Sequence, residues 1–257
     1  MSDLKLVAWQ LLYEQRAFWR NRARAFFAFA FPLIFLVIFS AIFQKHTIYL
    51  GRGHSISYDT FFVPGILAYG VIATTFLNMA VSTAVLRDDG VLKRMAGTPL
   101  PGWAYAAARI GSTVIVTILM TVLTLLIGYI AYDTQVRGST LPALIATLAL
   151  GSATFTTLGV ALVRYIPNAE AAPAIVNAAI LPLTFISGIW FHFDLSPALV
   201  DIAKVFPIRA LADGLQHAYN PFTGGAGFEG SDLLTLAIWL IVGVIGMIRF
   251  LRAPQRL

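Results

Sequence analysis

Apolar residues of this chain are gathered in six long runs, separated by shorter polar segments. Each run has at least 18 residues, and an α-helix of that length rises about 27 Å, close to the roughly 30 Å hydrocarbon layer of a bilayer. The runs cover residues 26–43, 61–85, 104–132, 141–163, 171–191 and 232–250. The pattern predicts an all-α polytopic membrane protein with six transmembrane helices, and residues 1–257 form a single membrane domain.

Basic residues are distributed unevenly over the segments between these runs. With both termini in the cytoplasm, the inner segments hold 11 of the 18 Lys and Arg residues and the outer segments hold five. The inner segments are 1–25, 86–103, 164–170 and 251–257, and the outer ones are 44–60, 133–140 and 192–231. The positive-inside rule therefore predicts cytoplasmic termini and a multi-pass protein of the cell (plasma or inner) membrane.

Composition agrees with a membrane protein and excludes several other classes. Apolar residues make up 58% of the chain and charged residues 12%, and the mean hydropathy is +0.79. A soluble domain carries about 25% charged residues. The net charge of +6 is explained by the inner segments, so no nucleic-acid partner is expected. The absence of cysteine excludes disulfides, thiolate nucleophiles and cysteine metal sites.

Residues 1–25 have the pattern of a helix lying on the membrane surface. Apolar side chains recur at helical spacing, and three arginines form an i, i+4 row. The apolar positions are Leu4, Val7, Leu11 and Phe18, and the basic row is Arg16, Arg20 and Arg24. This N-terminal amphipathic helix is either a simple interfacial anchor or an element that transmits movement from a cytoplasmic partner.

The outer segment 192–231 contains two short helical patterns. The first begins at Ser196-Pro197, and the second follows Pro207. Their apolar faces are Leu199, Ile202 and Phe206 in the first, and Ile208, Leu211, Leu215 and Ala218 in the second. Each pattern is too short to cross a bilayer, so we expect an external, re-entrant helical hairpin between the fifth and sixth crossings.

Few side chains suggest catalysis or cofactor binding. Gly225, Gly227 and Gly230 match G-x-G-x-x-G, but they precede a membrane helix and follow no predicted strand, so we expect a loop. The chain has no Walker A sequence, and therefore no P-loop of its own. An alternative function, an intramembrane metal-dependent enzyme, would use an external site built from His192, Asp194, Asp213 and His217. We otherwise expect no metal site.

Polar residues within the apolar runs are hydroxyls and amides rather than charges. Arg109 and Arg164 lie near helix ends, where we expect them to snorkel to the inner interface. With no ionisable group near the middle of a run, energy for transport must come from outside this chain. Candidate residues for either interhelical hydrogen bonds or a translocation path are Thr74, Asn78, Asn177, Thr184 and Ser187.

The inner loop 86–103 is the most informative segment. It combines five charges with three apolar residues in a short amphipathic helix closed by Gly97 and a Thr-Pro pair. Such a helix between two crossings suits docking into a groove on a cytoplasmic protein. The residues assigned to this docking are Arg87, Asp88, Asp89, Val91, Leu92, Lys93, Arg94, Met95, Thr98 and Pro99.

Two strings resemble signatures of ABC-2 type transporter permeases. GVLKRMAGTPLP at residues 90–101 is similar to the loop signature of that family, especially its drug-resistance and lipid exporter branch. LPLTFISGIWF at 181–191, followed by FPIR at 206–209, resembles the end of the fifth helix and the outer hairpin. Six crossings, inner termini and a length near 260 residues agree with the same family.

The resemblance implies a permease subunit of an ATP-driven exporter of hydrophobic or amphiphilic compounds. Residues 87–100 would be the coupling helix on a separate ATP-binding subunit, present in two copies, and residues 4–24 the connecting helix, with Leu11, Arg16 and Arg20. ATP and Mg²⁺ would bind the partner, and this chain would bind no cofactor and hydrolyse nothing. Helices one, two and five would face a second permease, as a homodimer or heterodimer.

Two further alternatives concern what passes through the membrane. A polysaccharide or glycolipid exporter would need a wide path lined with exposed aromatic rings, and helix one is crowded with phenylalanine. The residues concerned are Phe26, Phe27, Phe29, Phe31 and Phe35. Such crowding also suits lipid contact and packing. A channel working alone is a weaker alternative, because the sequence has no filter-like ring or charged pore segment.

Overall fold

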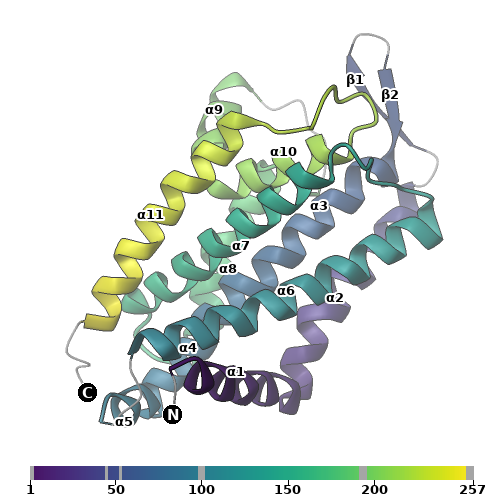
Figure 1. Ribbon diagram of the computed structural model, residues 1–257. Helices are drawn as coiled ribbons and strands as arrows, with labels where there is room; N and C mark the ends of the chain where they lie inside the picture. Colours follow the sequence, from purple (N-terminus) through teal and green to yellow (C-terminus); the bar gives the residue numbers. More distant parts are fainter. Residues whose placement is uncertain (1–2, 44–45, 52–53, 98–101, 191–195, 253–257) are drawn as a thin grey trace.

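The computed structural model describes residues 3–43, 46–51, 54–97, 102–190 and 196–252, which form a bundle of long helices (Figure 1). Five helical segments among them are long and apolar enough to cross a membrane. They are Arg22–Phe43, Tyr58–Asp88, Trp103–Tyr132, Leu141–Tyr165 and Gly230–Leu251. These segments coincide with five of the six predicted runs, so the chain is a mostly helical, polytopic membrane protein.

The long segments and the shorter elements between them follow one another as labelled in Figure 1. In chain order the elements are α1 (Asp3–Arg20), α2 (Arg22–Phe43), β1 (Thr47–Gly51), β2 (His54–Ser57), α3 (Tyr58–Ile72), η1 (Ala73–Leu77), α4 (Asn78–Asp88), α5 (Val91–Ala96), α6 (Gly102–Tyr132), α7 (Leu141–Leu162), η2 (Val163–Tyr165), α8 (Ala172–Ile186), α9 (Pro197–Val205), α10 (Pro207–Tyr219) and α11 (Gly230–Arg252).

The run predicted as the fifth crossing forms a shorter helix than expected. Helix α8 has 15 residues, which corresponds to about 22 Å. It ends at Ser187, because Gly188 adopts a φ of 71°, a left-handed conformation that favours glycine and stops a helix. The last residue of the run, Phe191, lies outside the described residues. A full sixth crossing therefore stays a prediction.

The second crossing is the buried centre of the bundle. It runs without a break through α3, one π-helical turn (η1) and α4, and most of its side chains are buried. The hydroxyls of Thr74 and Thr75 donate back to the carbonyls of Gly70 and Val71. Single π turns within α-helices are frequent at functional sites. This one lies midway along the crossing, next to α6 and α7.

A β-hairpin at the opposite end from α1 and α5 was not predicted (Figure 1). Strands β1 and β2 are antiparallel, and Ile48 pairs with Ile56. Both isoleucines are buried, whereas Tyr49, His54 and Ser55 are exposed. The expectation of an all-α protein is corrected to this extent. Alternating polar and apolar residues around Gly51 and Gly53 were a readable hairpin signal.

The two short helices expected in the outer segment are present as α9 and α10. Helix α10 packs against α3, α7 and α11, and its four predicted apolar residues are all buried. The packing is close: a Cβ atom on Gly151 of α7 would lie 2.6 Å from Leu211 Cδ1. On α9, by contrast, Leu199 and Ile202 are exposed. Helix α10 is thus part of the bundle core, and its place in a leaflet stays a prediction.

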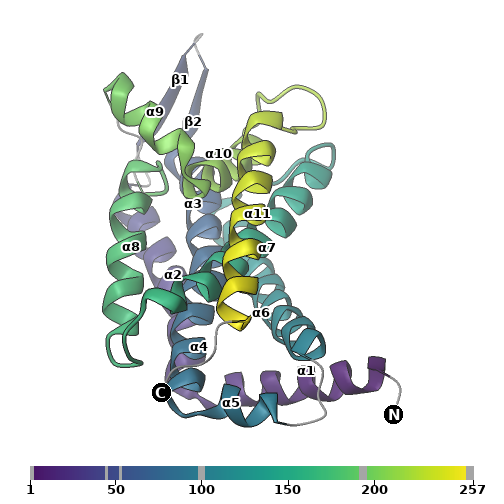
Figure 2. The ribbon, with the colours of Figure 1, turned by 90° about the vertical axis from the view of Figure 1, so that its left-hand side faces the viewer.

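Helices α1 and α5 lie side by side at one end of the bundle (Figures 1 and 2). Helix α1 packs along α6, and α5 follows directly from α4. The ends of α7 and α11 point to the same side of the molecule (Figure 2). We call this side the coupling side, since it carries both segments that the sequence assigned to a cytoplasmic partner.

Candidate functional site

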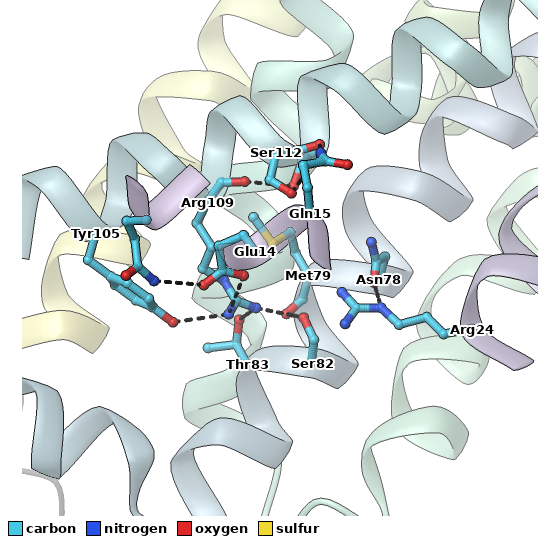
Figure 3. A network of polar contacts seen from close by, with 12 residues as sticks. Glu14, Gln15, Arg24, Asn78, Met79, Ser82, Thr83, Tyr105, Arg109 and Ser112 are labelled. Atoms are coloured by element: carbon cyan, nitrogen blue, oxygen red, sulfur yellow. Dashed lines mark hydrogen bonds and ion pairs between the residues drawn. The ribbon is translucent and has the colours of Figure 1, made fainter. Parts of the chain in front are cut away.

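A buried polar network on the coupling side joins α1, α4 and α6 (Figure 3). Its centre is Arg109 of α6, which is only 6% exposed. The guanidinium donates to Tyr105 Oη at 3.0 Å, Ser82 Oγ at 2.6 Å and Thr83 Oγ1 at 3.0 Å. Its Nη1 lies 3.8 Å from Glu14 Oε2 of α1. The expectation that Arg109 snorkels to the interface is therefore wrong. Its side chain points into the protein, where three hydroxyl groups accept its hydrogen bonds and a carboxylate lies nearby.

A second set of contacts fastens α1 along α6. Gln15 Nε2 donates to the backbone oxygen of Ser112 at 2.9 Å and to its Oγ at 3.0 Å. One turn earlier, Leu11 packs over Gly111, where an added Cβ would lie 2.9 Å from Leu11 Cδ1. The predicted connecting helix is thus bonded to a membrane crossing by side chains of its inner face, and is more than a surface anchor.

Arg24 forms a third link, and its position differs from the predicted basic row. Helix α1 ends at Arg20, and Asn21 Oδ1 accepts the backbone N–H of Arg24 at the start of α2. The Arg24 guanidinium lies over the Phe18 ring, and its Nε donates to Asn78 Oδ1 at 2.5 Å. The break at Asn21 turns Arg24 inward, so it does not continue the surface row.

The other two arginines of the predicted basic row lie on the surface of α1. Arg16 and Arg20 are exposed. The large aromatic side chains of α1, Trp9, Tyr13 and Trp19, are also among the exposed residues. Aromatic and basic side chains on one helix face are typical of the headgroup region. An interfacial position for this face stays a prediction.

The predicted coupling loop forms a turn followed by a short helix. Helix α4 ends at Asp88, and Gly90 turns the chain with a φ of 67°. Helix α5 then covers only six residues, and Gly97 N–H bonds back to the Arg94 carbonyl. Thr98 and Pro99 lie outside the described residues. The coupling helix is therefore present but shorter than the sequence segment assigned to it.

Two of the charged residues assigned to docking bind the connection between α7 and α8 of their own chain. Arg87 Nη1 donates to the carbonyls of Val163 at 2.9 Å and Ile166 at 2.8 Å, beyond the end of α7. Asp88 Oδ2 accepts the N–H of Ala169. These bonds tie the end of α4 to the connection between α7 and α8. Arg87 and Asp88 thus position the coupling loop, and their role toward a partner stays a prediction.

The apolar side of α5 points toward its own protein. Leu92 is 9% exposed and packs into the main hydrophobic core, and Val91 is half-buried. The side chain of Met95 lies outside the described part. Exposed on this loop are Asp89, Lys93 and Arg94. The predicted docking of Leu92 into a partner is corrected by this orientation, and the surface available to a partner is charged.

The polar residues proposed for a translocation path in the second crossing are engaged within the chain. Thr74 is fully buried and lies 3.0 Å, Oγ1 to Oγ1, from Thr117 of α6. Asn78 accepts the hydrogen bond from Arg24. Both side chains therefore make the interhelical bonds that were the alternative interpretation.

The path residues expected in the fifth crossing are also mostly buried within the chain. Thr184 is buried, and its Oγ1 accepts from Trp190 Nε1 at 3.1 Å. Ser187 is also fully buried, whereas Asn177 is half-buried on α8. Thr74, Thr184 and Ser187 present no surface in this arrangement, and a path that uses them stays a prediction.

The phenylalanines of α2 pack against one another and against Trp190. The rings of Phe31 and Phe35 lie 4.6 Å apart between centroids, and Phe35 and Tyr69 lie 5.3 Å and 4.9 Å from Trp190. Tilted and edge-to-face pairs at these distances stabilise packing. The aromatic crowding of helix one therefore includes a packed cluster and does not by itself indicate an open aromatic path.

Comparison with known proteins agrees with this arrangement. A model of the family described as ABC-2 type transporter matches residues 6–219, which is most of the chain. The chain belongs to the ABC-2 type transporter family. The family resemblance of the loop and the outer hairpin is thus confirmed, and the chain is a membrane-spanning, permease-type component of an ABC transporter.

Relatives of this ABC-2 family member are named as transport permeases. The inner membrane transport permease YadH of Escherichia coli K12 is 22% identical over 171 residues, and so are the proteins of that name in Escherichia coli O157:H7 and Shigella flexneri. The match covers 66% of this chain and 66% of each relative. The chain thus spans just under two thirds of the length of these relatives.

The external polar residues of this ABC-2 protein are not gathered into a metal site in the part that the structure describes. Asp213 pairs with Arg209 at 2.6 Å, and His217 Nε2 lies 3.9 Å from Glu229 Oε2. Burial raises the pKa of Asp213, and the Arg209 guanidinium opposes that rise. No group of three or more His, Cys, Asp or Glu that could hold a metal ion is found among the described residues. His192 and Asp194 lie outside them.

The G-x-G-x-x-G match lies in the loop between α10 and α11, and its last glycine, Gly230, is the first residue of α11. Gly225 and Gly227 adopt positive φ values of 66° and 72°, and α10, rather than a strand, precedes them. The expectation of a loop is confirmed. The glycines allow the turn that returns the chain from α10 to α11.

Sequence reasoning missed the Arg109 network, although one signal was present. Arg109 is the sixth residue of the third apolar run, and an ionisable residue within a run is a candidate functional residue by default. Its partner Glu14 comes from a segment 95 residues earlier. No spacing rule relates two such positions.

Proposed function

We propose that this chain is the permease subunit of an ATP-driven exporter that moves hydrophobic or amphiphilic compounds, drugs or lipids, out of the cell. Two copies of a separate ATP-binding subunit bind ATP and Mg²⁺, and a second permease, the same or different, completes the path. The protein lies in the inner membrane with both termini in the cytoplasm. Relatives named as inner membrane transport permeases support this proposal.

The observation that carries the proposal is the joint anchoring of α1 and α5 to the central crossing. Helix α5 is anchored through Leu92, which packs in the core, and through its short link to α4. Helix α1 is anchored through Arg109, which also holds Ser82 and Thr83 of α4. A displacement of the coupling side is therefore passed to α4 and α6 together.

This anchoring suggests how closure of the ATP-binding subunits moves the membrane helices. ATP draws the two cytoplasmic subunits together and carries α5 with them. Helix α4 follows, because α5 is joined to it by a short link. The connection between α7 and α8 moves with α4, because Arg87 and Asp88 bind it. The π turn η1 separates α4 from α3 and provides a place where the crossing can bend.

The proposal is tested by isolation of the complex and by transport. The permease is expressed with neighbouring genes, and the co-purified proteins are identified. Inside-out vesicles are then given ATP and either a lipophilic dye or a lipid-linked glycan. We expect an ATP-binding subunit in the complex and ATP-dependent uptake of the dye. Uptake of the glycan alone would favour the polysaccharide alternative, and ion flux without any ATPase would favour a channel.

Reversing the exposed charges of α5 is expected to weaken the partner complex. In the double variant Lys93→Glu/Arg94→Glu, like charges would face a partner surface that is complementary to the native lysine and arginine, so binding should fall by about tenfold or more. Measured quantities are the yield of co-purified ATPase and the dye uptake. Arg137→Glu, an exposed charge at the opposite end, serves as control. Equal yields for both variants would contradict the docking assignment.

A further inference from the structure

An apolar groove lies between α7, α8 and α11 in the part of the chain that the structure describes. Its volume is about 1050 Å³, and the bend between α9 and α10 lines one end. The walls are mostly aliphatic and aromatic, with Phe155 and Leu158 from α7, Leu183 from α8, and Trp239, Val242 and Ile245 from α11. None of the residues predicted for the translocation path lines it. The groove is thus a separate feature of the fold.

Two arginines line the groove at its coupling-side end. Arg164 comes from η2 and Arg249 from the end of α11. Both side chains are exposed, and neither takes part in a hydrogen bond or ion pair with another residue of the described segments. The lining includes no acidic residue. One end of the groove therefore carries an uncompensated charge of two cations.

The other end of the groove is aromatic. Trp239 Nε1 donates to the Val205 carbonyl at 2.7 Å, and its ring stacks with Phe206. Ten residues of α11 separate Trp239 from Arg249, which corresponds to about 15 Å. The groove thus has the form that an amphiphile with an anionic head and a long apolar tail requires.

We propose that this groove binds an anionic phospholipid from the leaflet on the coupling side. The phosphate group accepts hydrogen bonds from the two guanidinium groups, whose forked geometry matches it. The acyl chain lies along Val242 and Ile245 toward Trp239. The assignment to the cytoplasmic leaflet rests on the orientation in the proposed function, whereas the binding itself does not.

A lipid in this groove would bridge α8 and α11, two helices that both pack on α10 but otherwise pack mainly on different neighbours. Helix α11 packs along α7, whereas α8 packs on α4, α9 and α10. The lipid contacts both sides through Leu183 and Val242. We therefore expect the bound lipid to hold α8 in place relative to α11.

Native mass spectrometry of the purified permease without its partner tests the proposal. The protein is mixed with phosphatidylglycerol or with phosphatidylcholine of the same chains. We expect preferential retention of phosphatidylglycerol, and a loss of about fivefold in its affinity for Arg164→Gln or Arg249→Gln, since a basic residue near lipid headgroups contributes that much. Arg164→Lys and Arg249→Lys keep the charge and should retain most of the binding. Arg137→Gln removes a distant charge and should change nothing.

A matched pair of tryptophan variants tests the apolar part of the groove. Ala179 lines it, whereas Ala178, its exposed neighbour on α8, does not. Ala179→Trp should abolish lipid retention and Ala178→Trp should keep it. Equal retention of both lipids would overturn the proposal. Loss of the dimer rather than of the lipid in Ala179→Trp would also overturn it, because a second copy of the chain would then occupy the groove. Neither result depends on an ATP-binding subunit, so failure of the proposed function is seen separately.

Discussion

Arg109→Met is expected to lower the free energy of unfolding by about 3–5 kcal/mol, because removing one partner of a buried ion pair leaves the other charge unpaired. The variant loses three hydrogen bonds to hydroxyls and leaves Glu14 without its cation in a largely buried position. In a chain of this size the midpoint of thermal unfolding in detergent should fall by about 10 °C. ATP-dependent uptake should fall as well, since α1 loses its ion pair with α6 and α6 loses its hydrogen bonds to α4.

A double-mutant cycle separates the ion pair from the hydrogen bonds. Glu14→Gln removes the carboxylate alone, and Glu14→Gln/Arg109→Met leaves no uncompensated charge, so the double variant should be more stable than the sum of the single losses. Arg109→Lys keeps the charge but cannot reach three hydroxyls at once, and should lie between. Arg137→Gln, exposed and at the far end, should behave as wild type. Strict additivity in the cycle would mean that Glu14 and Arg109 are not coupled.

The sequence predicted the long helices well, because the bilayer provides a fixed length against which an apolar run is measured. The other five runs agree with the structure to within a few residues at each end, as at α2, which begins at Arg22 rather than at residue 26. The α8 run is the exception, since Gly188 ends the helix by its backbone conformation. Helix ends depend on such local backbone states, which hydropathy does not report.

The direction in which individual side chains point was not predictable in the same way. Leu92 belongs to a helix of six residues, and an apolar face of that size fits either a partner or the protein's own core. Arg109 lies near a helix end, as a snorkelling arginine does, but the partners that hold it come from α1 and α4. Both choices are made by tertiary contacts between distant segments. The candidate site therefore combines predicted segments with residue roles that only packing decides.

Gly65→Ala is expected to give the second large effect, at the contact between α3 and the segment that follows α8. A Cβ on Gly65 would lie 2.3 Å from the backbone oxygen of Ile189 and 3.3 Å from its carbonyl carbon. Backbone atoms cannot rotate away as a side-chain tip does, so the segment must shift. That shift would disturb Trp190, whose carbonyl accepts from Tyr58 Oη and whose ring lies in the aromatic cluster. A loss of about 1–3 kcal/mol follows from overpacking of this kind.

Two other glycines make this prediction a graded series. At Gly70 an added Cβ would lie 2.9 Å from the flexible end of the Met120 side chain, which can move away. In addition, alanine in place of glycine stabilises a helix by about 1 kcal/mol. Gly70→Ala should therefore be nearly neutral. Gly138 has no atom within 4 Å of an added Cβ, and Gly138→Ala serves as control. Thermal unfolding of the three variants should show a large loss only for Gly65→Ala, whereas equal losses at Gly65 and Gly70 would mean that Ile189 does not approach α3 this closely.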